Sequence, residues 1–206
     1  MKHAALGIRM HSGWGVLVAV SWDANSVEVV TRKRIITTDP SIAGSNQPYH
    51  YAASLALRKS GLPQAETYLA NCAAVSERLA SAAVAEAVRE LDARHYRIVA
   101  SAVLLASGRP LPSLAKILAA HPLIHTAEGE FFRNAVRQAC EALKIPVTAI
   151  TERELDERAK KTFGKAASQL QRQIAKLGSA IGPPWTKDHK TAALAASIIL
   201  ENEQTI

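Results

Sequence analysis

Four acidic residues are the strongest candidates for chemistry in this sequence: Asp188, Glu128, Glu130 and Glu152. Carboxylates that converge on one point can hold divalent metal ions, which align a water molecule with the leaving oxygen of a phosphodiester. His125 lies close to two of the acids and could add an imidazole ligand. One hypothesis is therefore a site for a divalent metal ion such as Mg²⁺; without such a site, we expect no cofactor and no bound metal.

A simpler interpretation accounts for most of these acids. The pattern predicts one helix from Glu128 to Leu143, entered through His125 and Thr126, and another that begins at Glu152. Acids in the first turn of a helix are stabilised by the positive end of its dipole. We favour this second interpretation, so the catalytic residues remain unassigned.

The positive charge of the chain is concentrated near the C-terminus. The formal net charge is +7, from 25 Lys and Arg against 18 Asp and Glu. Eight of the bases lie between Arg158 and Lys190 with Asp188 as the sole acid, and the other 17 bases are balanced by 17 acids. Such a segment can attract a phosphate backbone by long-range steering, or it can be an ordinary solvated helix face. The candidate nucleic-acid contacts are Arg158, Lys160, Lys161, Lys165, Arg172, Lys187 and Lys190, with Trp185 among them.

Trp185 follows two prolines in a loop and is flanked by Lys187 and Lys190. An aromatic ring in a basic setting can stack on a base while the lysines hold its phosphate. A tryptophan in such a loop can equally anchor a helix to the core, because tryptophan is largely buried on average. The second reading is favoured, but both remain open.

The elements that must position these groups follow a mixed α and β order. Three strands are predicted at the start, over 5–10, 14–21 and 26–37, joined by hairpin turns such as His11-Ser12-Gly13. Apolar runs predict two more strands, from Arg97 to Ser107 and over 145–150. Helical periodicity fills the rest, over 49–60, 64–93, 113–120, 128–143, 152–163, 166–177 and 188–201, with a loop over 178–187. The expected architecture is α/β: a mixed five-stranded sheet with helices on both faces.

This order resembles the ribonuclease H-like fold, and within it the Holliday-junction resolvases of the RuvC type. Three segments carry the resemblance: Leu6-Gly-Ile-Arg-Met-His-Ser-Gly-Trp-Gly at the first hairpin, Pro146-Val-Thr-Ala-Ile at the last strand, and Asp188-His-Lys-Thr-Ala-Ala-Leu-Ala-Ala at the final helix. The resemblance covers most of the chain and implies one ribonuclease H-like domain over residues 1–206.

The resemblance also implies a set of metal-binding acids that this sequence mostly lacks. Arg9, Met10 and His11 stand around the position of the expected first-strand aspartate, and no acid occurs from Arg97 through Lys116. Asp188 remains near the place of the terminal acid. One carboxylate cannot hold a magnesium pair, so catalysis by the usual mechanism of that family is not expected.

Three functions therefore compete. The leading hypothesis is a catalytically inactive, resolvase-like protein that binds DNA or RNA through its basic segment. The alternatives are a metal-dependent nuclease with relocated acids and a protein-interaction module in which an alanine-rich helix pairs with its copy in a homodimer. No apolar run reaches the roughly 18 residues that a bilayer span needs, and no signal-peptide core precedes the first charges, so a cytoplasmic protein without membrane contact is expected.

Overall fold

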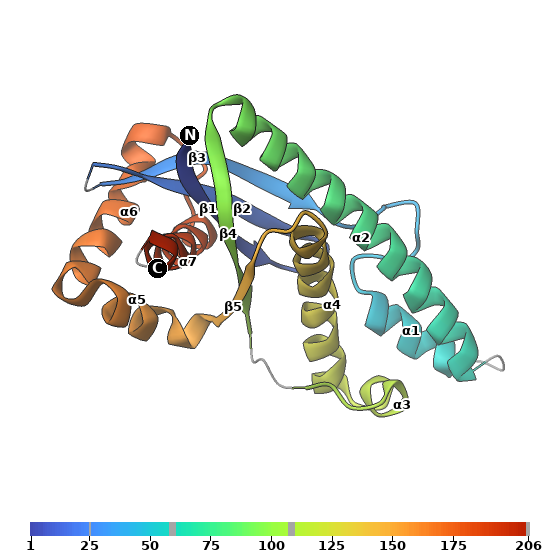
Figure 1. The fold of residues 1–206 in the computed structure, drawn as a ribbon. Helices are drawn as coiled ribbons and strands as arrows, with labels where there is room; N and C mark the ends of the chain where they lie inside the picture. The colour runs from blue at the N-terminus through green and yellow to red at the C-terminus, as the bar shows by residue number, and fades with distance from the viewer. Residues whose placement is uncertain (25, 58–60, 107–109, 205–206) are drawn as a thin grey trace.

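A five-stranded mixed sheet forms the centre of the computed structural model (Figure 1), which describes residues 1–24, 26–57, 61–106 and 110–204. The strand order is β3-β2-β1-β4-β5. The strands β1 to β3 are antiparallel neighbours, whereas β4 pairs parallel to β1 and β5 pairs parallel to β4. The strands are β1 (Lys2–Met10), β2 (Trp14–Asp23), β3 (Ser26–Ile36), β4 (Tyr96–Leu105) and β5 (Val147–Thr151). The predicted fold class and all five strands are confirmed.

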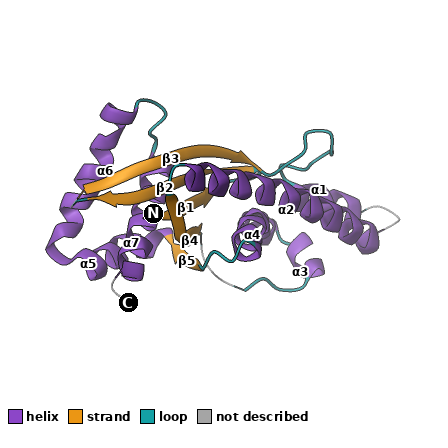
Figure 2. Cartoon of the chain, turned by 45° about the horizontal axis from the view of Figure 1, so that its top comes forward, coloured by secondary structure: helices purple, strands orange, loops and turns teal. Residues whose placement is uncertain are grey.

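Helices cover both faces of this sheet. They are α1 (Pro48–Ala56), α2 (Gly61–Ala93), α3 (Leu114–Leu118), α4 (His121–Ala142), α5 (Leu155–Phe163), α6 (Ala167–Ile181) and α7 (Lys187–Gln204). Short 3₁₀ helices, Glu152–Glu154 and Gly164–Ala166, precede α5 and α6. Figure 2 shows α5, α6 and α7 grouped on one side and α1 to α4 on the other. None of the described helices is long and apolar enough to cross a bilayer.

The alternation of side chains along β1 assigns each residue to one of these two layers. Leu6 and Ile8 belong to the hydrophobic core under α2 and α4, and Ala5 belongs to the core under α5, α6 and α7. By the same alternation Gly7 and Arg9 lie on the α7 side. The strand therefore presents small residues to α7 and ends, on that face, with an arginine.

The final helix is enclosed by protein along most of its length. Every residue from Ala192 to Leu200 is buried, and α7 contacts β1, β2 and β4 on one side and α5 and α6 on the other. A helix that is apolar all round is the type that can be buried in this way. A Cβ added to Gly7 would overlap the carbonyl oxygen of Ala192, so the absence of a side chain at Gly7 lets the helix lie close to the sheet.

A second, smaller layer lies beyond the sheet. Small hydrophobic clusters hold α1 and α3 against α2 and α4, with Ala52, Leu55 and Ile117 among their buried residues. In Figure 1 these helices lie together to the right of the strands. Their packing places the first turns of α1 and α4 side by side.

Two helix boundaries differ from the sequence prediction. The helix predicted from Glu128 begins at His121, because Pro122 occupies its first turn, where a proline is favoured. Glu128 and Glu130 are therefore in the middle of α4, and their interpretation as acids of a first turn is wrong. The helix predicted to end at Leu177 continues to Ile181, so the loop is shorter than expected.

Ser60 and Ser107, the predicted ends of the first helix and the fourth strand, lie outside the described residues. Within the described part, α1 ends at Ala56 and β4 at Leu105.

Candidate functional site

Three chain segments meet at the edge of the sheet where the parallel strands end. Arg9 is near the end of β1, Glu152 follows β5 directly, and Asp188 lies in the first turn of α7. The carboxyl ends of parallel strands are the usual location of a ligand crevice in α/β proteins. The fold thus brings together three charged groups that are far apart in the sequence.

Arg9 bridges the two acids. Its Nε and Nη2 atoms donate to Oε1 of Glu152, at 3.0 and 2.9 Å, and its Nη1 donates to Oδ1 of Asp188. The side chains of Arg9 and Asp188 are 17% and 20% exposed, and that of Glu152 is 38% exposed. Because partial burial limits solvent screening, these ion pairs are stronger than pairs on an open surface. The planar fork of donors on the guanidinium suits two carboxylates at once.

His11 completes the cluster from the first hairpin. Its Nε2 lies 2.9 Å from Oδ2 of Asp188 and 2.8 Å from Nη1 of Arg9, so it acts as donor to the first or acceptor from the second according to its tautomer. The imidazole also stacks on Trp14, with the ring centroids 4.4 Å apart. These contacts fix the ring beside Asp188.

The residues at this edge do not fit a pair of magnesium ions. Mg²⁺ needs several oxygen ligands around it at about 2.0–2.1 Å, and here the guanidinium of Arg9 stands between the two carboxylates. Its five N–H groups offer no acceptor and carry the positive charge that a metal would bring. Among the described residues, the sole group of three or more potential ligand atoms within 4.8 Å of one another lies elsewhere.

The other candidate acids have separate partners. Glu128, 2% exposed, accepts hydrogen bonds from His50 of α1, at 2.8 Å from Nδ1 and 3.2 Å from the backbone nitrogen. Glu130 pairs with Arg133 one turn along α4, at 3.2 Å. The structure thus brings Glu152 and Asp188 together around Arg9 and places Glu128 and Glu130 in contacts of their own.

The basic segment lies on the helices of the α7 side. All of its members are exposed except Lys190, which is half-buried. Its members by element are Arg158, Lys160 and Lys161 on α5, Lys165 before α6, Arg172 and Lys176 on α6, and Lys187 and Lys190 at the start of α7. Arg158 lies 3.6 Å from Glu154. No other member forms an ion pair within the described part of the chain. Their charges are available to an external anion.

A cleft of about 340 Å³ connects the basic segment to the Arg9 cluster. Its lining comes from α5, α6 and α7 and the turn before α5, and it includes apolar side chains such as Ile174 together with two lysines and two acids: Lys187, Lys190, Glu152 and Asp156. Cations and acids thus share the lining of a single depression.

Trp185 is half-buried against the core on this side. Its Nε1 donates to the carbonyl oxygen of Ile174 at 2.7 Å, and its ring packs on Gly178, where an added Cβ would lie 2.9 Å from the indole. Arg32 of β3 donates to the carbonyl oxygens of Ile181, Gly182 and Pro183, which stabilises the end of α6. The contacts of Trp185 are those of a residue that anchors a loop, and stacking of its ring on a base stays a prediction.

His189 is a second titratable group near the start of α7. It is 6% exposed, and its Nδ1 accepts from the hydroxyl of Thr186 at 2.8 Å. Burial, and next the positive charge of Arg32, lower the pKa of His189 from the ordinary value of 6.5, against the opposing effect of Asp188.

We expect this shift to make the protein less stable in acid. The unfolded chain binds the proton of His189 more readily, so the free energy of unfolding is fully retained above about pH 6.5 and falls as the pH drops below it. Urea denaturation at several pH values measures this fall, and His189→Gln should reduce it while His95→Gln, at an exposed position, should not. An unchanged pH dependence in His189→Gln would contradict the assignment.

Comparison with known proteins identifies the class of fold. No protein-family model and no curated protein sequence matches the chain. Among solved structures, RuvC of Thermus thermophilus is similar to this chain, with 12% sequence identity and a TM-score of 0.50 over 98% of this chain and 96% of that one. The chain therefore has a ribonuclease H-like fold, and the expected similarity to RuvC is confirmed at the level of the fold.

Two further solved structures align with this chain, one over nearly its whole length and one over about four fifths of it. T. thermophilus RuvC in complex with a Holliday-junction substrate aligns over 98% of this chain and 96% of that one, at 11% identity and a TM-score of 0.48. A Ppx/GppA family member from Aquifex aeolicus aligns over 79% of this chain and 38% of that one, at 12% identity and a TM-score of 0.36.

Sequence reasoning missed the pairing of Arg9 with the two acids. Arg9 stands at the position of an expected aspartate, and its residue type alone does not indicate its partners. A signal was nevertheless present: each of the three residues falls at the end of a predicted strand or the start of a predicted helix. Once the strands are known to be parallel, their ends must meet at one edge.

Proposed function

We propose that this protein is a catalytically inactive member of the ribonuclease H-like fold that binds nucleic acid through its basic segment. The observation that carries the proposal is the guanidinium of Arg9 between Glu152 and Asp188. In the proteins that this fold resembles, metal ions would be expected at this edge of the sheet. Here the positive charge comes from the guanidinium of Arg9, and the carboxylates of Glu152 and Asp188 both bind it. The arrangement stabilises the edge of the sheet instead of binding metal ions.

The unpaired charges of the basic segment support nucleic acid as the partner. Lysine and arginine side chains that neutralise phosphates release condensed counterions, and this supplies most of the affinity in binding that is independent of sequence. Lys160, Lys161, Lys165 and Lys187 are exposed and have no acidic partner among the described residues. The cleft lined by Lys187 and Lys190 offers a place for a phosphate to approach the Arg9 cluster.

Fluorescence anisotropy tests the proposal. It measures the affinity of the protein for a labelled DNA duplex over a range of salt concentrations. Four phosphate contacts predict a slope of about −3.6 for the logarithm of the association constant against that of the salt concentration. The affinity should then fall about 100-fold between 50 and 200 mM salt. Absence of binding at 50 mM salt, or a flat salt response, would remove nucleic acid as the partner.

A monomeric protein in light scattering would count against the alternative of a dimerisation module.

A further inference from the structure

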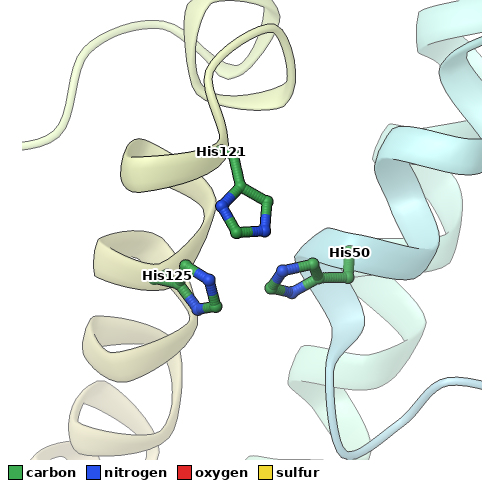
Figure 3. A group of neighbouring side chains, drawn as sticks. All are labelled: His50, His121 and His125. Carbon is green, nitrogen blue, oxygen red and sulfur yellow. The ribbon is translucent and has the colours of Figure 1, made fainter.

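A cluster of three histidines lies on the opposite side of the sheet from the Arg9 cluster. His50 is in the first turn of α1, and His121 and His125 are in the first two turns of α4. The spacing of four residues places the two α4 histidines on one face of that helix. Figure 3 shows the three imidazole rings turned toward one another across the space between the two helices.

The distances within the cluster are short. The ring centroids of His121 and His125 are 4.5 Å apart, and those of His50 lie 4.7 Å from His125 and 5.3 Å from His121. One nitrogen from each ring can be chosen so that all three lie within 4.8 Å of one another. In a tetrahedral zinc site with bonds of about 2.0–2.1 Å, ligand nitrogens are roughly 3.4 Å apart. The two α4 side chains are exposed, so their rings can rotate toward shorter distances when a metal binds.

A buried carboxylate supports the first of these ligands. Glu128, one turn beyond His125, is 2% exposed and accepts from Nδ1 of His50 at 2.8 Å. Its other oxygen accepts from the backbone nitrogen of His50 at 3.2 Å, which fixes the position of the carboxylate. A histidine that binds metal through one ring nitrogen usually donates from the other to a carboxylate, which orients the ring and makes it a stronger ligand. With Nδ1 engaged in this way, Nε2 of His50 faces the other two rings.

We propose that His50, His121 and His125 form a binding site for a divalent transition metal, with zinc as the preferred ion and Glu128 as the carboxylate that orients His50. Imidazole nitrogens suit zinc and its neighbours in the first transition row, whereas magnesium and calcium prefer oxygen. Three protein ligands leave a fourth position for a water molecule, on the side where His121 and His125 are exposed. The bound metal would also add a link between α1 and α4, which are already joined by a small hydrophobic cluster and by the contact between His50 and Glu128.

Titration calorimetry with Zn²⁺, together with visible spectroscopy of the Co²⁺ form, tests the site in the full chain. The wild-type protein should bind one Zn²⁺, and Co²⁺ should give the intense absorption bands of a four-coordinate site. His121→Ala and His125→Ala should each lower the affinity for Zn²⁺ at least about 100-fold. Both positions are exposed, so these variants should keep the circular dichroism spectrum of the wild type. His3→Ala, which removes an exposed histidine from β1, is the matched control and should bind zinc normally.

The role of Glu128 has its own readout. Glu128→Gln keeps the side chain's size and an oxygen acceptor but removes the charge, so the affinity for Zn²⁺ should fall about 10- to 100-fold while one ion still binds. Zinc should raise the melting temperature of the wild type and fail to do so in His125→Ala. Normal zinc affinity in both α4 variants, or loss of zinc binding in His3→Ala instead, would overturn the site. A Glu128→Gln variant that binds zinc as the wild type does would overturn the role of the carboxylate.

Discussion

Reversal of four charges in the basic segment is expected to reduce the affinity for a DNA duplex by about 4 × 10³-fold at 100 mM salt. The variant carries Lys160→Glu, Lys161→Glu, Lys165→Glu and Lys187→Glu. Each lost phosphate contact lowers the association constant by nearly one power of ten under these conditions, and four losses accumulate. The slope of affinity against salt should become much shallower at the same time. All four side chains are exposed, so the fold should be unaffected.

A matched control separates a local effect from one of net charge. The control changes four exposed bases from α2, α3 and the segment after α4 to glutamate: Arg78, Arg89, Lys116 and Lys144. Both variants alter the net charge equally, but the control leaves the α5–α7 side intact. Its affinity for the duplex should stay within a few-fold of the wild type. Equal losses in the two variants would show that the basic segment is not a contact surface.

Gly7→Ala is expected to destabilise the protein by about 3 kcal/mol, which is large for the addition of one methyl group. The new Cβ would overlap the carbonyl oxygen of Ala192, a backbone atom of a helix enclosed on both sides, so neither partner can move away easily. Denaturant unfolding of the two proteins measures the change. Separation of α7 from β1 would also weaken the contact between Arg9 and Asp188.

Gly129→Ala is the control for the glycine effect. Gly129 lies inside α4, where the atoms nearest to an added Cβ belong to the far end of the Arg133 side chain and not to backbone. Alanine is favoured over glycine within a helix by about 1 kcal/mol, so this variant should be as stable as the wild type or more so. A Gly7→Ala protein with wild-type stability would mean that α7 does not lie against β1 as described.

The sheet could be predicted because its signals are local. Alternating apolar residues and glycine-containing turns define β1 to β3 within forty residues, and their pairing follows from the short connections. The apolar run before Ser107 required a buried strand. Connections in α/β proteins are short and their crossovers are right-handed, so only a few orders of these five strands in one sheet are possible.

The helix boundaries were less predictable because proline and glycine have more than one use. The sequence prediction begins α4 only at Glu128, but Pro122 fits the first turn of a helix that begins at His121. Gly178 was taken as the end of α6, but the helix continues through it and the indole of Trp185 packs where a side chain would be. For Gly178, a contact in the folded protein that the local sequence does not show decides the role.

Both candidate clusters, around Arg9 and around His50, depend on contacts over long sequence separations. Arg9 meets Glu152 at a separation of 143 residues and Asp188 at 179. His50 meets Glu128 at a separation of 78 residues, and it was not singled out because no neighbouring ligand marked it. The sequence draws attention to these acids but does not indicate their partners.

The most direct test of the central claim is a cleavage assay on a four-way DNA junction with Mg²⁺ or Mn²⁺ present. Because Arg9 engages both carboxylates at the edge of the sheet, the wild-type protein should bind the junction and leave every strand intact over hours of incubation. Metal-dependent cleavage that disappears in Asp188→Asn would contradict the account, since it would show that this carboxylate serves a metal ion and not the arginine.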